Sequence, residues 1–258
     1  MCTVITLRRP GHPWPLLLAA NRDEMADRPW KPPARHWPDR PEVIAGLDVL
    51  AGGSWLGLND LGVVAGILNR HGTLGPAAGR RSRGELVLEA LDHADAADTA
   101  RAFEAIEPTS YRPFNMIVAD SRDAFWIAHR GDHAAITVEP IPEGVSMLTA
   151  HDLNDTIGSP RVARYLHRFR AAPSPDPARD DWGAWSMLLG ARDADPEAGP
   201  AGAMTVTSFT GFGTSSAALI ALPAPGGGRP VFRFAAGRPD HTPFAPINDP
   251  MLGTPPVD

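Results

Sequence analysis

The sequence has a single cysteine, Cys2, among its 258 residues. One cysteine excludes an intrachain disulfide, a four-cysteine zinc site and a two-cysteine redox motif. The chain also lacks an apolar run of about 18 residues, the length that a membrane-spanning helix requires. Its first two apolar runs, Thr3–Leu7 and Leu16–Ala20, are separated by arginine and proline, unlike the core of a signal peptide. We therefore expect a cytoplasmic protein without an integral membrane segment.

Basic residues are spread along the chain, and only one of them, Lys31, is a lysine. The formal net charge is −6, and no basic stripe is present that would indicate a nucleic-acid partner. The sequence has no glycine-rich phosphate loop and no haem-attachment motif. The expected partner is therefore a small-molecule ligand or substrate, and the sequence does not predict an oligomeric state.

Hydrophobic residues make up 43% of the chain, which is enough for a sizeable core. The 25 glycines and 28 prolines predict many turns and long loops. We expect one domain over residues 1–238 and a proline-rich tail over residues 239–258.

Hydrophobic periodicity predicts short strands and short helices. Strands are expected at Thr3–Leu7, Leu16–Ala20, Phe114–Ala119, Ala124–Ala128, Val145–Ala150, Met204–Phe209, Ala217–Leu222 and Val231–Phe234, with a hairpin formed by Ser54–Asn59 and Gly62–Leu68. Helices are expected after a Ser82 cap, over 95–106, from Pro160 onward and over 181–191. Residues 25–42 are expected to form an irregular proline-rich loop. This order is not a repeating βαβ pattern. It favours an α+β fold in which two antiparallel sheets are sandwiched between helical layers.

Cys2 is the first candidate for chemistry. If Met1 were removed, Cys2 would carry a free α-amine, whose pKa of about 7.7–8.0 leaves part of it neutral at pH 7. A nucleophile and a base on one residue suffice for acyl transfer. The alternative is a buried cysteine that acts only as a small hydrophobic residue.

Four polar residues, Asn21-Arg22-Asp23-Glu24, follow the second apolar run directly. Arg22 could position a thiolate, and Asp23 could receive the α-ammonium group of Cys2. The alternative is a solvated turn.

A glycine-rich motif, Gly52-Gly53-Ser54-Trp55-Leu56-Gly57, precedes Asn69. Its glycines permit close backbone approach or positive φ. The Asn69 amide could donate a hydrogen bond to an oxyanion, and its alternative role is that of a turn residue before Gly72.

Met1-Cys2-Thr3, the Asn21–Glu24 tetrapeptide and the glycine-rich motif with Asn69 together resemble the NRDE family, also called the transport and Golgi organisation protein 2 family. The resemblance implies a four-layer αββα fold similar to the N-terminal-nucleophile (Ntn) hydrolases, including choloylglycine hydrolases and penicillin V acylase. It implies that Cys2 is the nucleophile, that Arg22 and Asp23 support it, and that Asn69 forms part of an oxyanion hole. Asn21, Glu24, Trp55 and Asn154 are the residues expected to contact the substrate.

Two positions depart from those hydrolases. His151 stands where they have a second oxyanion asparagine, and Ser215 lies near the place of a late-strand arginine. His151 could donate a hydrogen bond or act as a base, or it could be an ordinary loop histidine. His129 and His133 are four residues apart, but a strand and turn would not bring their side chains together, so no metal site is expected.

Two functions follow. The first is an N-terminal-cysteine amidohydrolase or acyltransferase that acts on a small non-peptide amide or thioester. The second, which the resemblance introduces, is a non-enzymatic trafficking factor that binds haem, acyl-CoA or lipid. No cofactor is expected in either case, with haem considered only as a transported ligand.

Overall fold

The computed structural model describes residues 2–131, 134–207 and 210–253. The chain divides into two compact units, each with its own sheet and helices. The first unit comprises Met1–Asp27, Pro142–Thr149 and Leu153–Asp258, and the second comprises Arg28–Ile141 and Ala150–Asp152. Within the described residues, the two sheets are antiparallel throughout and four α-helices accompany them, which confirms the predicted α+β class.

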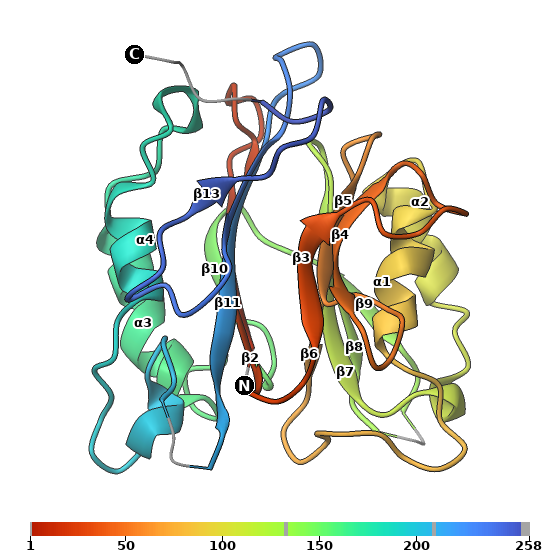
Figure 1. The fold of residues 1–258 in the computed structure, drawn as a ribbon, viewed down its shortest axis with the longest axis vertical. Helices are drawn as coiled ribbons and strands as arrows, with labels where there is room; N and C mark the ends of the chain where they lie inside the picture. The colour runs from red at the N-terminus through yellow and green to blue at the C-terminus, as the bar shows by residue number, and fades with distance from the viewer. Residues whose placement is uncertain (1, 132–133, 208–209, 254–258) are drawn as a thin grey trace. The chain divides into compact units, whose positions relative to one another are not determined.

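The first unit contains a sheet of order β10-β1-β2-β11-β12-β13. Its strands are β1 (Thr3–Arg8), β2 (Leu16–Met25), β10 (Gly144–Leu148), β11 (Phe212–Leu222), β12 (Val231–Ala235) and β13 (Ala245–Pro246). The helices α3 (Pro160–Ala171) and α4 (Gly183–Leu189) cover one face of this sheet (Figure 1), and the 3-10 turns are η2 (Pro177–Arg179) and η3 (Gly199–Gly202). The apolar face of α3 packs with Trp185 and Leu189 of α4 on the strands to form the core of the unit.

The second unit contains a sheet of order β3-β4-β5-β6-β7-β8-β9. Its strands are β3 (Trp30–Ala34), β4 (Val43–Asp48), β5 (Leu56–Asn59), β6 (Val64–Asn69), β7 (Phe114–Ala119), β8 (Ala124–His129) and β9 (Thr137–Pro140). The helices α1 (Gly84–Leu91) and α2 (Ala96–Phe103) lie over one face of it (Figure 1), followed by the 3-10 turn η1 (Pro108–Ser110). Leucine and valine side chains of α1 pack on β4 and on the strands β6 to β8 to form a second core.

The sequence predicted an irregular loop over residues 25–42, and this prediction is wrong for part of the segment. The segment contains β3, an edge strand that pairs Lys31 with Leu47 and Ala34 with Ala45. The register shifts between these two pairs, at Pro32 and Pro33, which have no N–H group to donate. Proline is tolerated here because an edge strand needs hydrogen bonds on one side only.

The strand predicted over Met204–Phe209 is also wrong where the structure describes it. Residues 204–207 form no strand, and residues 208–209 lie outside the described residues. Thr205 instead donates its backbone N–H to Ala191 O at 2.9 Å and its hydroxyl to Leu189 O at 2.9 Å. These bonds hold the segment against the end of α4.

Helix α1 begins at Gly84, with Arg83 rather than Ser82 in the capping position. The neighbouring backbone sets this start, because a Cβ atom on Gly53 would lie 2.5 Å from the carbonyl carbon of Gly84. Ser54 N–H also donates to Gly84 O at 3.0 Å.

The first two glycines of the glycine-rich motif thus have different roles. Gly52 turns with φ of +72°, and Gly53 lets the chain pass close to α1.

Candidate functional site

The tetrapeptide Asn21–Glu24 lies within a strand, because β2 continues to Met25. The alternative of a solvated turn is therefore wrong. Strand β2 pairs with β1 on one side and with β11 on the other, and Asn21, Arg22 and Asp23 are all buried. Since side chains of a strand alternate between faces, Asn21 and Asp23 share one face and Arg22 and Glu24 share the other.

Asn21 and Asp23 point toward the helices of the first unit. Asn21 Nδ2 donates to Leu189 O and to Met204 O, both at 2.9 Å. The Asp23 carboxylate receives hydrogen bonds from Thr214 Oγ1 at 2.6 Å and from Arg161 Nη1 of α3 at 3.0 Å. Asn21 thus fixes the strand to the α4 region, and Asp23 is one half of a buried ion pair.

Arg22 and Glu24 lie on the opposite face of β2. The Arg22 guanidinium donates to Ser215 Oγ at 3.1 Å, and Arg22 Nη2 lies 3.7 Å from Glu24 Oε2. Ser215 is at an irregularity in the pairing of β11 with β2, where the register shifts between Thr214 and Ser216. Because neighbouring residues of a strand face opposite sides, Thr214 contacts Asp23 on one face of the sheet and Ser215 contacts Arg22 on the other.

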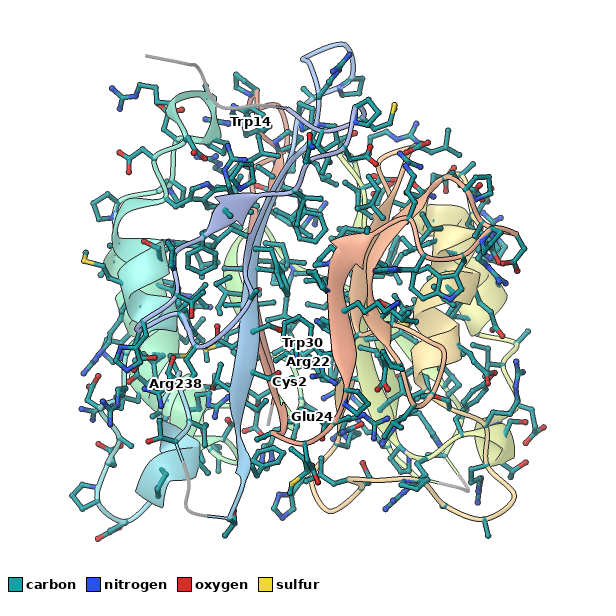
Figure 2. The ribbon with its side chains drawn as sticks, in the orientation of Figure 1. Cys2, Trp14, Arg22, Glu24, Trp30 and Arg238 are labelled. Atoms are coloured by element: carbon teal, nitrogen blue, oxygen red, sulfur yellow. The ribbon has the colours of Figure 1, made fainter. Side chains whose placement is uncertain are left out.

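Cys2 lies immediately before β1, and Figure 2 shows it at the same end of the β1–β2 pair as Arg22 and Glu24. Thr3 pairs with Asn21, so the register brings Cys2 beside the tetrapeptide. The half-buried thiol donates a weak hydrogen bond to the Asp23 carbonyl oxygen, with Sγ and O 3.6 Å apart. The structure thus brings Cys2, Arg22 and Asp23 close together.

Burial raises the pKa of the Cys2 thiol above its ordinary value, and the negative charge of Asp23 raises this pKa further. The amino terminus, the hydrogen bond to Asp23 and the charge of Arg22 act in the opposite direction but are outweighed. A raised pKa favours the protonated thiol, so the sulfur needs a base before it can act as a nucleophile.

Sequence reasoning missed Arg161 and Thr214. Arg161 lies on the buried face of α3, one residue after Pro160, which takes the first helical position after the Ser159 cap. A charged residue among Val162, Tyr165 and Leu166 on an apolar helix face requires a buried partner. The sequence could therefore have indicated that Arg161 needs a buried partner, whereas nothing in the sequence identifies Asp23 as that partner.

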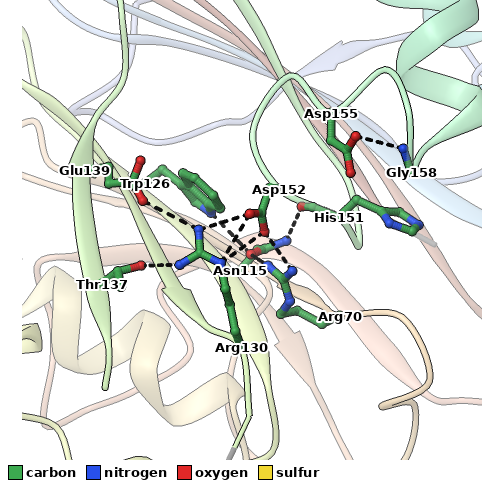
Figure 3. Close-up of polar contacts among 10 residues, drawn as sticks. All are labelled: Arg70, Asn115, Trp126, Arg130, Thr137, Glu139, His151, Asp152, Asp155 and Gly158. Carbon is green, nitrogen blue, oxygen red and sulfur yellow. Dashed lines mark hydrogen bonds and ion pairs between the residues drawn. The ribbon is translucent and has the colours of Figure 1, made fainter. Parts of the chain in front are cut away.

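The second unit holds a separate polar cluster at the ends of β6 and β7 (Figure 3). The buried side chain of Asn115 accepts from Arg70 Nη1 at 2.7 Å and from Trp126 Nε1 at 3.2 Å, and it donates to His151 O at 2.6 Å. Asp152 accepts from Arg70 Nη2 at 2.7 Å and from Arg130 Nη2 at 3.1 Å. Burial opposes ionisation of Asp152, but the hydrogen bonds from both arginines outweigh it, so its pKa lies below the ordinary value.

This cluster fixes the backbone at His151. His71 N–H donates to Ala150 O at 3.1 Å, and the His71 and His151 rings stack with centroids 5.6 Å apart. The half-buried Asn69 ends β6 beside this cluster, where it pairs with Phe114 of β7. The structure thus places Asn69 and His151 in the same part of the second unit.

The other two predicted substrate-binding residues, Asn154 and Trp55, also have structural contacts. Asn154, in the first unit, has φ of +58° and exchanges hydrogen bonds with Met147 of the edge strand β10, through its N–H at 2.9 Å and its Oδ1 at 2.8 Å. Trp55, in the second unit, meets Trp30 edge to face at 5.9 Å and covers Gly46, where a Cβ atom would lie 2.4 Å from its ring. Their part in substrate binding stays a prediction.

Among residues 2–131, 134–207 and 210–253, no three metal-ligating side chains gather in a way that could hold a metal ion. His133 lies outside this described part of the chain. None of the described helices is long and apolar enough to cross a membrane.

Comparison with solved structures shows the fold. The chain is similar to the Caenorhabditis elegans ortholog of N-acylethanolamine-hydrolyzing acid amidase, with a TM-score of 0.58 and 14% identity over 85% of this chain and 92% of that one. It is also similar to penicillin V acylase from Agrobacterium tumefaciens, with a TM-score of 0.54 and 13% identity over 91% of this chain and 83% of that one. These are Ntn-hydrolase folds, as the sequence predicted.

Comparison of sequences identifies the family. The Bos taurus Transport and Golgi organization protein 2 homolog is 35% identical over 142 residues, which cover 51% of this chain and 50% of the relative. The chain therefore matches about half the length of such curated relatives. The model of the Transport and Golgi organisation 2 family matches residues 1–180. Since this match spans more than half of the chain, the protein belongs to the Transport and Golgi organisation 2 family.

Proposed function

We propose that this protein is an N-terminal-nucleophile amidohydrolase or acyltransferase that acts on a small non-peptide amide or thioester. The observation that carries the proposal is the position of Cys2, whose thiol contacts the main chain of Asp23 beside Arg22 and above a buried ion pair. The likeness in fold to proteins named as an amidase and an acylase supports it.

The reaction begins with the α-amine that removal of Met1 would leave on Cys2. With a pKa of about 7.7–8.0, this amine can take the thiol proton at neutral pH. The sulfur then attacks the carbonyl carbon of the substrate, so that a C–S bond forms and the C–N bond breaks. The departing amine takes the proton from the α-ammonium group.

The second half of the reaction returns the enzyme to its starting state. Water, or an acceptor amine or alcohol, attacks the thioester carbonyl with the α-amine as the base. The new bond to carbon forms, the C–S bond breaks, and the sulfur recovers its proton. With a thioester substrate the same steps hold, except that a thiol leaves in the first half.

Each site residue has a proposed role. Arg22 and Asp23 position the nucleophile and balance its charge, while Asn21 holds β2 in place. Asn69 and His151 belong to the second unit, and their roles stay predictions from the sequence: donation of a hydrogen bond to an oxyanion and, for His151, service as a base.

Glu24, Trp55 and Asn154 remain candidates for substrate contact. A single substitution at a residue that contacts the substrate should raise KM and leave kcat nearly unchanged.

The deciding experiment compares the processed protein with its Cys2→Ala variant on a panel of N-acyl amides of increasing acyl length. Release of free amine by the wild type and its complete loss in Cys2→Ala is the expected result. An Arg101→Ala variant serves as a folded comparison, because Arg101 is an exposed residue of α2 that has no part in the proposed site. Equal amine release by the wild type and Cys2→Ala would refute the proposal.

The alternative proposal is a carrier of haem, acyl-CoA or lipid. It is favoured by the raised pKa of the Cys2 thiol and by the presence of Ser215, rather than a second cation, beside Arg22. A binder does not need a nucleophile that is activated. Titration of the protein with haem and with a long-chain acyl-CoA distinguishes the two functions, because saturable binding without turnover supports the carrier.

A further inference from the structure

A buried guanidinium lies behind the strand pair that carries Cys2. The Arg161 side chain is only 1% exposed and the Asp23 side chain is 0% exposed. Arg161 Nη1 donates to Asp23 Oδ2 at 3.0 Å and to Thr3 Oγ1 at 2.6 Å, and Nη2 donates to Ala201 O of η3 at 3.1 Å. A guanidinium in such a place is retained only when its partners compensate for the lost hydration.

These contacts reach both residues that determine where the thiol lies. Thr3 is the neighbour of Cys2 in the chain, and Asp23 supplies the carbonyl oxygen that the thiol contacts. Arg161 therefore connects β1, β2 and η3 through one side chain, and Thr214 of β11 holds the second oxygen of Asp23.

We infer that Arg161 is a positioning residue for Cys2. By binding Thr3 and Asp23, it fixes the thiol against β2 and offsets the negative charge of the Asp23 carboxylate. A contribution of Arg161 to catalysis rests on the proposed function. Its effect on the position and pKa of the Cys2 thiol does not depend on that function.

The charged groups around Cys2 define the expected effect. Asp23, the amino terminus and Arg22 act on the thiol directly. Glu24 lies beside Arg22, and Arg161 pairs with Asp23 from α3, so both act through these neighbours. Loss of Arg161 would leave the Asp23 charge uncompensated, and the pKa of the Cys2 thiol should rise. Each unit of rise reduces the thiolate fraction about tenfold at a pH below the pKa.

The test follows the rate of Cys2 alkylation by iodoacetamide as a function of pH, which is unambiguous because the chain has one cysteine. The Arg161→Gln variant should react about tenfold more slowly at neutral pH, with its titration midpoint moved upward. Arg161→Lys, which keeps the charge, should restore most of the rate.

The matched control is Arg233→Gln. The Arg233 side chain is 3% exposed and contacts Asp180 at 2.7 Å in the same unit, so this variant also removes a buried guanidinium. It should leave the alkylation profile of Cys2 unchanged. Equal profiles for Arg161→Gln and Arg233→Gln would overturn the inference.

A double variant keeps the test decisive if Arg161→Gln does not fold. Asp23→Asn with Arg161→Gln replaces the ion pair by two amides of similar size and leaves no isolated charge. Because both charges of the pair are then absent, compensation by Arg161 predicts a thiol midpoint close to that of the wild type, whereas Asp23→Asn alone should lower it. An equally lowered midpoint in the single and the double variant would contradict the inference.

Turnover separates this inference from the proposed function. If the wild type proves inactive on every amide and thioester, the proposed function fails, while the alkylation profiles still decide the role of Arg161. If the wild type is active, Arg161→Gln should lower kcat and leave KM nearly unchanged.

Discussion

The polar cluster of the first unit and that of the second unit have similar components but differ in burial. Around Cys2, the Arg161–Asp23 pair is excluded from water, with side chains 1% and 0% exposed. In the second unit, Arg70 and Arg130 bind an Asp152 side chain that is 43% exposed. Buried charge pairs are costly to break and fix geometry closely, whereas exposed pairs add little stability. The first cluster therefore suits the positioning of a reactive group, and the second suits the anchoring of a short segment, residues 150–152, on its sheet.

The largest expected effect is that of Asp23→Ala. This variant leaves the Arg161 guanidinium buried without its carboxylate, which should cost about 3–5 kcal/mol in the free energy of unfolding. Urea unfolding followed by tryptophan fluorescence measures the loss. A cost as small as that of an exposed pair would remove the distinction between the two clusters.

A smaller loss is expected for Asn115→Leu, at the one fully buried side chain of the Arg70–Asn115–Asp152 group. The substitution leaves Arg70 Nη1, Trp126 Nε1 and His151 O without this partner, at a cost of about 2–3 kcal/mol. The same unfolding assay checks this value. Alkylation of Cys2 in the folded variant provides the control, since a role confined to anchoring predicts an unchanged rate.

The smallest effect is expected for Asp152→Asn, at most about 1 kcal/mol near pH 7 because water screens the exposed pair. The folded-state pKa of Asp152 is lowered, so its contribution is present above the unfolded value and is lost as the pH falls through the folded value. The difference between wild type and variant should therefore shrink below about pH 4. It should also shrink in high salt, and a difference that is independent of both pH and salt would show that the pair is not electrostatic in origin.

The sequence predicted the fold class and most strands and helices, because their apolar periodicity records which face is buried. The resemblance to the NRDE family grouped Cys2 with Arg22 and Asp23, and the pairing of β1 with β2 places these residues close together. The sequence did not predict that β2 extends through Asn21–Glu24, because four polar residues in succession are typical of a turn.

The contacts of the site that the sequence did not predict join residues far apart in the chain. The partner of Arg161 is 138 positions away in the chain, and Thr214 is 191 positions from Asp23. Local periodicity cannot identify such pairs. The edge strand β3 was missed for a different reason, because Pro32 and Pro33 hide a strand that pairs around them.

In the proposed mechanism, Cys2 is the reactive group of a chain from which Met1 has been removed. The direct measurement is intact-protein mass spectrometry, with peptide mapping, after incubation with an activated acyl ester. We predict a chain that lacks Met1 and carries one acyl group on Cys2, which is absent from Cys2→Ala. A chain that retains Met1 and forms no adduct on Cys2 would contradict the central claim.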